Sequence, residues 1–228
     1  DTGGYVAVAD RADRLPRFKR PRGEALPRQE SGQRPARPLP YDLEATGGMA
    51  TDGRFSLSIR NRGKAGAPLI VYAGKKSAGP WFYTAEAGKE IRDMLPVSGR
   101  TFHFSVHGPN GFLREFRGEA AESGIRVEAR YDAANEALIL SVRNDGAAAR
   151  DIATRMRDYG SEAGKTYRLP PGSAIEDRRP IAASDHWYDL ELAAGKTVWR
   201  FAGHVETGRV SRSDPALGRT EEKSQPPA

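Results

Sequence analysis

The sequence contains no cysteine, which excludes disulfide bonds, thiol nucleophiles and thiolate metal sites. It also has no apolar run near the ~18 residues that indicate a membrane-spanning helix. Histidine is scarce, and none of the four stands in an HExxH or comparable ligand spacing (His103, His107, His186 and His204). These absences leave few routes to metal-dependent or nucleophilic chemistry within the chain.

The remaining residues offer no better catalytic group. There is no GxSxG nucleophile motif, and Ser105 and Ser141 lie within expected strands. Glu86 and Glu90 fall in a turn region, where both carboxylates would ionise without the apolar setting that raises a pKa. The sequence therefore predicts no catalytic, cofactor-binding or metal-binding residue, and no cofactor.

Positive charge is concentrated in one segment. Residues 11–37 contain nine basic and three acidic side chains, a net of +6, which equals the formal charge of the whole chain. Such a run can attract a polyanion, but Phe18 is its only aromatic residue, which gives little support for base stacking. We interpret it as a solvated, proline-rich tether and regard nucleic acid as the less favoured partner.

Two stretches of the chain are nearly the same. FSLSIRNRG at 55–63 returns as LILSVRNDG at 138–146, so that Asn144 follows Asn61 by 83 residues. Further on, Phe-Arg-Gly at 116–118 returns as Phe-Ala-Gly at 201–203, with an offset of 85. Two distant matches at almost one offset predict two copies of a module of roughly 80 residues.

The pattern within each copy is that of short strands. Apolar and polar residues alternate over 55–60, 102–106, 125–131 and 138–142. Asn110-Gly111, flanked by such runs, indicates a hairpin. A second hairpin is expected over 187–201, around Gly195. The stretch 147–160 is the best helix candidate, but its counterpart at 67–73 is strand-like, so a strand with an irregular insert is expected.

Many short strands separated by turns predict an all-β fold. We expect two tandem small antiparallel β-sandwich (Ig-like) domains, preceded by a Pro/Arg-rich extended segment. The expected division is a basic linker region at 1–40, a first sandwich at 41–120, a second at 121–210 and a disordered tail at 211–228.

Clusters of aromatic residues are the remaining indication of a possible binding surface. In a domain of this size most large aromatic side chains belong to the core, but an exposed subset near hairpins would suit lipid headgroups or sugars. Arg114 and Arg117 could add attraction for an anion near such a patch. The candidate surface or ligand contacts are Trp81, Tyr83, Asn110, Arg114, His186 and Trp187.

Three long motifs carry a resemblance to a known family. They are LPRQESGQRPARPLPY (26–41), GPNGFLREFRG (108–118) and WRFAGHVETGRVSRSDPALG (199–218). Together they resemble the C-terminal region of bacterial phosphocholine-preferring phospholipases C. In that family a large catalytic domain, related to acid phosphatases and to the alkaline-phosphatase superfamily, is followed by two copies of a small β-rich domain. Residues 1–22 would then be the end of the catalytic region and the start of the linker.

The resemblance implies a non-catalytic role, because no position here matches the family's nucleophile or metal ligands. The chain would be the C-terminal part of a secreted or periplasmic enzyme that hydrolyses phosphatidylcholine-type lipids to diacylglycerol and a phosphorylated headgroup. It would pack on the catalytic domain and help it meet a phospholipid surface. The segment 155–164 and the run PWFYT depart from the family pattern. The alternative is a stand-alone module that binds lipid headgroups or carbohydrate.

Overall fold

The computed structural model describes residues 32–74, 79–120, 124–160 and 163–216. The predictions for 1–31 and for 217–228 lie outside these ranges. The described residues form strands and one short 3-10 helix: β1 (Pro35–Ala36), β2 (Leu43–Met49), β3 (Phe55–Asn61), β4 (Ala67–Ala73), β5 (Trp81–Ala85), β6 (Glu90–Leu95), β7 (Thr101–His107), β8 (Leu113–Glu119), β9 (Ile125–Asp132), β10 (Ala137–Asn144), β11 (Arg150–Asp158), β12 (Lys165–Leu169), β13 (Ala174–Pro180), η1 (Ala182–Ser184), β14 (Trp187–Ala194), β15 (Thr197–His204) and β16 (Ser211–Arg212).

The two halves of the described chain are built on one plan. In the first half, the three-stranded sheet β2-β3-β6 faces the four strands β5-β4-β7-β8. In the second half, the sheet β9-β10-β13 faces the four strands β12-β11-β14-β15. All pairings within these sheets are antiparallel. The predicted all-β sandwich organisation is confirmed.

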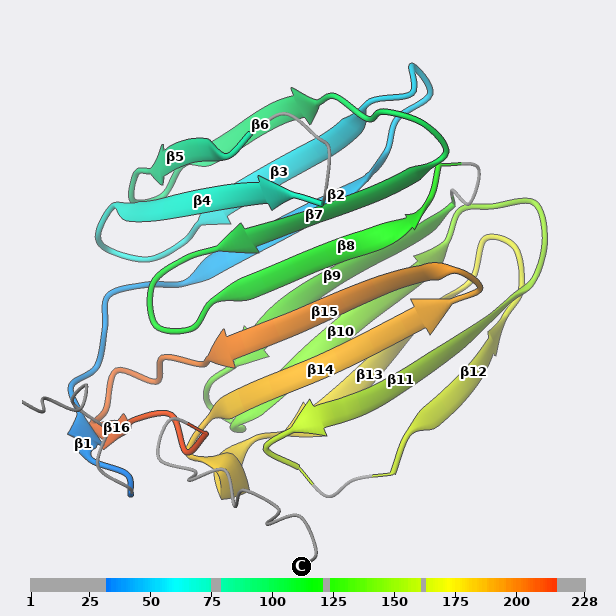
Figure 1. Cartoon of the computed structure of the whole chain (residues 1–228). Coiled ribbons are helices and arrows are strands. Elements are labelled where there is room, and N and C mark those ends of the chain that lie inside the picture. The colour runs from blue at the N-terminus through cyan, green and yellow to red at the C-terminus, as the bar shows by residue number, and fades with distance from the viewer. Residues whose placement is uncertain (1–31, 75–78, 121–123, 161–162, 217–228) are drawn as a thin grey trace, which may run out of the picture. The chain divides into compact units, whose positions relative to one another are not determined.

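The sequence did not reveal how the halves join. Strand β8 pairs antiparallel with β15, with Phe116 opposite Trp199 and Arg114 opposite Phe201. This pairing fuses the two four-stranded layers into one eight-stranded sheet (Figure 1). The halves are therefore not two free-standing sandwiches in a row, because they share a sheet as well as a core.

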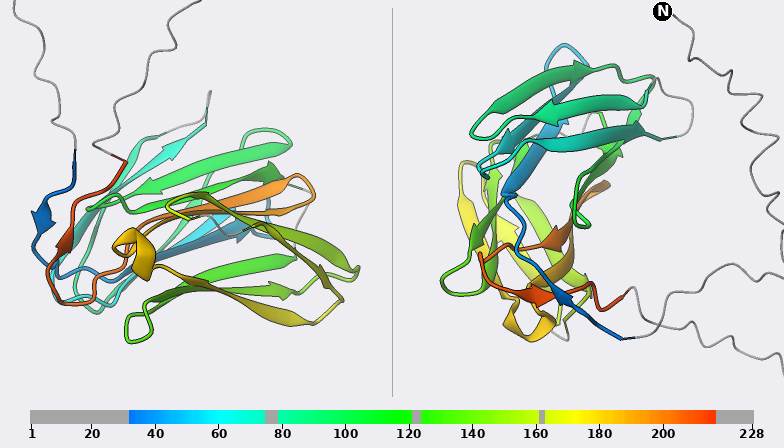
Figure 2. Two further views of the ribbon diagram at one scale, coloured as in Figure 1. Left: turned by 90° about the horizontal axis from the view of Figure 1, so that it is seen from below. Right: turned by 90° about the vertical axis from the view of Figure 1, so that its left-hand side faces the viewer.

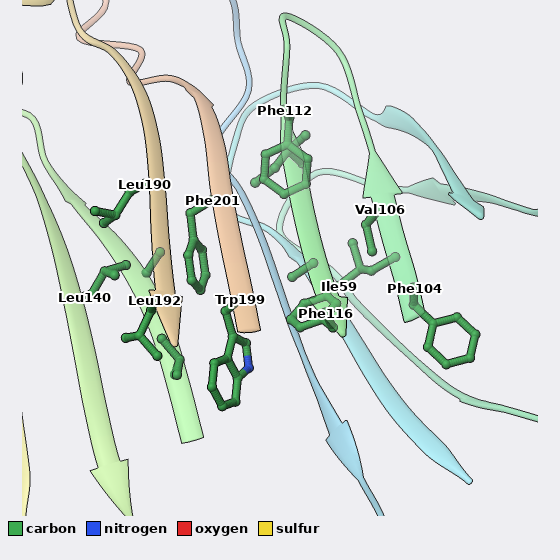
Figure 3. Close-up of a cluster of buried hydrophobic side chains, with 14 of the residues drawn as sticks. Ile59, Phe104, Val106, Phe112, Phe116, Leu140, Leu190, Leu192, Trp199 and Phe201 are labelled. Atoms are coloured by element: carbon green, nitrogen blue, oxygen red, sulfur yellow. The ribbon is translucent and has the colours of Figure 1, made fainter. Parts of the chain in front are cut away.

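The core follows the two-residue period of the strands. Along β3, for example, Phe55, Leu57 and Ile59 are buried between more exposed neighbours. One cluster of buried side chains runs through both halves. Figure 3 shows part of it, with Phe116 and Trp199 on adjacent strands of the shared sheet. The core thus continues across the β8–β15 junction.

The local predictions agree with the structure in most places. Asn110 and Gly111 both have positive φ, 53° and 72°, as expected of a tight hairpin turn between β7 and β8. The helix candidate at 147–160 is strand β11, with the expected irregularity between Met156 and Asp158. Strands β6, β12 and β13 were not predicted, and the residues of β6 do not alternate cleanly. No helix in the described ranges is long and apolar enough to cross a membrane.

The ends of the described chain lie together. Strand β1 pairs with β16, so part of the predicted tail is ordered (Figure 2). The backbone N–H of Ser213 donates to the C=O of Arg34, and the N–H of Arg34 donates to Ser213 Oγ. The segment that enters the sandwich is thereby attached to the segment that leaves it.

The repeated Arg-Asn-x-Gly motif has a structural cause. Asn61 is fully buried, and its Nδ2 donates to the C=O groups of Ala65 and Ala85, both at 2.8 Å. Its Oδ1 accepts from the N–H of Gly63. Asn144 makes the same hydrogen bonds: its Nδ2 donates to the C=O groups of Ala148 and Leu169, and its Oδ1 accepts from the N–H of Gly146. Each asparagine satisfies three backbone groups, one of them buried, where a strand ends and a turn begins.

Candidate functional site

An apolar patch is exposed on the outer face of the eight-stranded sheet. Phe82 is 73% exposed and Tyr72 is 45% exposed. Phe82, on the edge strand β5, lies opposite Ile70 of β4, and Tyr72 is the next outward residue of β4. The ring of His107 meets that of Tyr72 edge-on at 5.3 Å. We call Ile70, Tyr72 and Phe82 the aromatic patch.

The predicted contacts Trp81 and Tyr83 flank Phe82 but face the opposite side of β5. Both are only partly exposed and pack against the core. Trp81 lies 6.1 Å from the ring of Phe104, and the Tyr83 hydroxyl donates to Asp93 at 2.6 Å. Burial and the Asp93 carboxylate raise the pKa of Tyr83. On this strand the exposed aromatic side chain is Phe82, which the sequence analysis did not select.

Arg114 was expected at the surface, but its side chain is fully buried. The reason is its register: it lies opposite Phe201 on the inner face of the shared sheet. The expectation of an exposed anion-attracting residue at this position is therefore wrong. Arg117, three residues on, does lie on the outer face and contacts Glu191 at 3.5 Å.

Arg114 joins strands from both halves. Its Nη2 donates to Tyr131 Oη (2.7 Å), to Tyr188 Oη (3.2 Å) and to Glu44 (3.5 Å). Its Nη1 donates to the C=O groups of Leu113 and Ala202. Burial raises the pKa of the Glu44 carboxyl, and Arg114 opposes this only in part. We call Arg114, Glu44, Tyr131 and Tyr188 the buried arginine cluster.

The other predicted contacts lie near the β1–β16 ladder. Trp187 is buried, and its Nε1 donates to the C=O of Arg212 at 3.0 Å. His186 is mostly buried, with Nε2 3.1 Å from Glu136. Asn110 donates through Nδ2 to Glu206 Oε1 at 2.8 Å. These side chains hold structural contacts, and their role in ligand binding stays a prediction.

Glu206 attaches the entering segment to the second half. Its Oε2 accepts from the backbone N–H of Leu39 at 3.0 Å, and its Oε1 contacts both Asn110 and His204 Nδ1. Burial alone would raise the pKa of Glu206, but the hydrogen bonds from His204, Leu39 and Asn110 outweigh it and lower the pKa. The carboxylate is therefore the favoured form in the folded protein.

We expect acid to release this attachment. Because folding lowers the pKa of Glu206, its ionised carboxylate stabilises the folded state at pH values above the usual pKa of 4.5. This stabilisation is lost as the pH falls through the lower pKa of the folded state. At neutral pH, Glu206→Ala should raise the hydrogen-exchange rate of the Leu39 amide by about tenfold or more. Glu136→Ala, which removes a carboxylate that contacts a histidine but not the segment, is the control. Equal protection of Leu39 in all three proteins would contradict the expectation.

Among the polar side chains of the described ranges, one serine lies beside a histidine. No group of three histidine, aspartate or glutamate side chains is placed to hold a metal ion there. Ser105 Oγ lies 3.0 Å from His107 Nε2, but the nearby carboxylate of Glu115 contacts His103 instead. Burial lowers the pKa of His107. The serine–histidine contact therefore lacks the orienting carboxylate of a triad.

Comparison with known proteins decides the family. The family model of the bacterial phospholipase C C-terminal domain matches residues 35–119 and again residues 125–204. The chain belongs to this family. The two matched ranges correspond closely to the two halves of the described structure, β1 to β8 and β9 to β15.

Several curated relatives agree with this assignment. Non-hemolytic phospholipase C of Burkholderia pseudomallei is 41% identical over 95% of this chain and 32% of its own length. Non-hemolytic and hemolytic phospholipases C of Pseudomonas aeruginosa are 34% and 35% identical, over 96% and 85% of this chain. The phospholipase C C-terminal region described here spans about a third of the length of these relatives.

Proposed function

We propose that this chain is the non-catalytic C-terminal accessory region of a secreted bacterial phospholipase C that hydrolyses phosphatidylcholine-type lipids. It would consist of two copies of one domain that pack on the catalytic domain of the same polypeptide and assist contact with a lipid surface. The observation that carries the proposal is the family match over both halves of a chain that spans a third of its relatives.

The intact mass of the native protein tests whether the region belongs to a longer enzyme. We expect the culture supernatant or periplasm to contain a product roughly three times the length of this chain, as in the relatives. A native product of the 24.9 kDa of this chain would instead favour the stand-alone module for lipid headgroups or carbohydrate.

The aromatic patch supports the lipid-surface part of the proposal. An exposed apolar patch commonly marks a site of interaction, and aromatic rings suit the boundary between headgroups and acyl chains. Of the large exposed hydrophobic residues of the described chain, Tyr72 and Phe82 lie together in the first half, and Val210 is the single one in the second half. The first half would therefore carry the contact.

Vesicle binding tests this role. We expect the chain to sediment with phosphatidylcholine vesicles, and Phe82→Ser combined with Tyr72→Ser to weaken binding about tenfold or more, because each exposed ring would bury apolar area in the membrane. Val210→Ser removes an equally exposed apolar side chain far along the chain and serves as the control. Binding that is unchanged by the double substitution would contradict the role of the patch.

A further inference from the structure

Strand β5, the last strand of the shared sheet in the first half, has a free edge. Within the described residues, β5 pairs only with β4, and it ends the eight-stranded order on one side (Figure 1). Strand β12 ends the same sheet on the other side. A free edge presents unpaired N–H and C=O groups, which are a template for a further strand.

The backbone groups of Phe82 and Thr84 point to this edge. The N–H of Gly74 donates to the C=O of His103, so the even-numbered residues of β4 hydrogen-bond to β7. The odd-numbered residues of β4 therefore hydrogen-bond to the odd-numbered residues of β5, which lie opposite them. Pro68, which has no N–H, lies opposite Thr84, as this alternation requires. The N–H and C=O groups of Phe82 and Thr84 thus remain for another strand.

Strand β12 is the counterpart of β5 in the second half. The Tyr83 hydroxyl of β5 donates to Asp93 at 2.6 Å, and the Tyr167 hydroxyl of β12 donates in the same way to Asp177 at 3.1 Å. In both strands the tyrosine is half-buried between two exposed residues. The two tyrosines therefore occupy equivalent positions, and the residues beside them can be compared one by one.

The two edges differ in charge. The exposed residues of β5 are Phe82 and Thr84, and the strand contains no charged side chain. The equivalent residues of β12 are Thr166 and Arg168, and Lys165 precedes them. Charged side chains on an edge strand are a common protection against pairing with another molecule. The edge of β12 has this protection, and the edge of β5 does not.

The shared sheet shows that one half pairs with the other through an edge. Strands β8 and β15 are equivalent, since the sequence around Phe116 returns around Phe201 with an offset of 85. They pair antiparallel, with Phe116 opposite Trp199 and Arg114 opposite Phe201. The two phenylalanines thus lie symmetrically about the pairing, as in a two-fold contact between identical strands. Strand β5 is the other edge of the same four-stranded layer.

We propose that two molecules of this chain associate through β5, with the two strands paired antiparallel about a two-fold axis at Tyr83. Phe82 of one molecule then lies opposite Thr84 of the other, and each such pair exchanges both of its main-chain hydrogen bonds. The ring of Phe82, which is 73% exposed in the single chain, becomes partly covered. The aromatic patches of the two molecules lie on one continuous face of the joined sheet.

A second molecule fits this edge better than the domain that the proposed function places before β1. Strand β1 pairs with β16, and Trp187 of β14 donates to the C=O of Arg212 in β16. Four strands lie between β14 and β5 in the sheet order. At the usual strand spacing this separation is roughly 24 Å. The preceding domain is therefore attached far from the edge of β5.

Thr84→Pro removes an N–H that the second molecule needs. This N–H points away from β4, so the substitution leaves the hydrogen bonds between β4 and β5 in place, which is where an edge strand tolerates proline. Thr166→Pro is the matched control. Thr166 is also an exposed threonine, and it occupies the place of Phe82 on the equivalent edge strand β12.

Sedimentation equilibrium measures the association. The average mass of the chain should rise from 24.9 kDa towards twice that value between about 10 µM and 1 mM, because such short edges permit only weak association. Thr166→Pro should behave like the unsubstituted chain, and Thr84→Pro should stay monomeric throughout. Hydrogen exchange at the amides of Phe82 and Thr84 should slow as the concentration of the unsubstituted chain rises.

Two charged variants test the same pairing without proline. One combines Phe82→Lys with Thr84→Lys, and the other combines Phe82→Glu with Thr84→Glu. Both change only exposed side chains. Each variant alone should stay monomeric, because like charges face each other across the two strands. An equimolar mixture of the two should form a mixed dimer.

Four results would overturn the proposal. They are a chain that stays monomeric up to about 1 mM, a dimer that survives Thr84→Pro, and a mixture of the charged variants that stays monomeric. The fourth is a longer polypeptide, including the preceding domain, that stays monomeric while this chain dimerises, because that domain would then cover β5. The lipid-surface role is tested separately by vesicle binding, so either idea can fail without the other.

Discussion

Replacing Asn61 or Asn144 by alanine is expected to lower the free energy of unfolding by about 3 kcal/mol in each case. Each substitution removes hydrogen bonds to three backbone groups, of which the C=O of Ala85 (for Asn61) or of Leu169 (for Asn144) is left buried without its partner, and a buried unsatisfied group costs about 1–3 kcal/mol. For a domain of this size the melting temperature should fall by about 6–12 °C. Denaturant titration and calorimetry measure both quantities.

The two losses should be similar, because the two side chains make the same hydrogen bonds at the same place in their halves. Asn135→Ala is the control. Asn135 is exposed and contacts only Asp132 through its side chain, so this change should stay within about 0.5 kcal/mol of the wild type. A small effect at Asn61 or Asn144 would show that the repeated motif does not stabilise the fold.

Arg114→Met is expected to have the larger effect, about 3–5 kcal/mol, because it leaves the buried carboxylate of Glu44 without its charge partner. Glu44 should then take up a proton more readily. A carboxyl whose pKa is raised by folding gives stability below the unfolded-state pKa, and that stability is lost as pH rises through the folded value. The deficit of this variant, measured by denaturant titration, should therefore shrink on acidification.

A double variant separates charge from packing. Glu44→Leu combined with Arg114→Met removes both charges from the buried arginine cluster and leaves Tyr131 and Tyr188 hydrogen-bonded to each other at 2.9 Å. Replacing a whole buried ion pair by apolar side chains is often close to neutral. We expect the double variant to regain most of the stability that Arg114→Met loses. A double variant as unstable as the single one would show that the cluster acts through shape alone.

The sequence was sufficient to predict the repeated plan and most of its strands, although not β6, β12 or β13. Period-two alternation around Phe55 and Val127 reflects a force that acts locally, the burial of one strand face. Asn110-Gly111 specifies its turn through the φ angles that these two residues tolerate. Strand alternation and turn type depend on residues that are close in the sequence, so they can be predicted from a single sequence.

The joining of the halves and the exposure of single residues could not be predicted in this way. Whether Arg114 is inside or outside depends on the pairing of β8 with β15, which joins residues more than eighty positions apart. Phe82 is exposed because β5 is the last strand of the sheet and nothing covers its outer side within the described chain. The local alternation of apolar and polar residues determines neither the β8–β15 register nor the position of β5 at the sheet edge. The exposed residues of the candidate site could therefore be identified only in the structure.

The measurement that tests the account most directly compares two purified, metal-supplemented proteins on phosphatidylcholine. One is this chain, and the other is the longer polypeptide that includes the residues preceding it. The account predicts release of phosphocholine by the longer polypeptide and no turnover by the chain alone. Hydrolysis by the chain alone, at a rate above that of a denatured control, would contradict a non-catalytic accessory region.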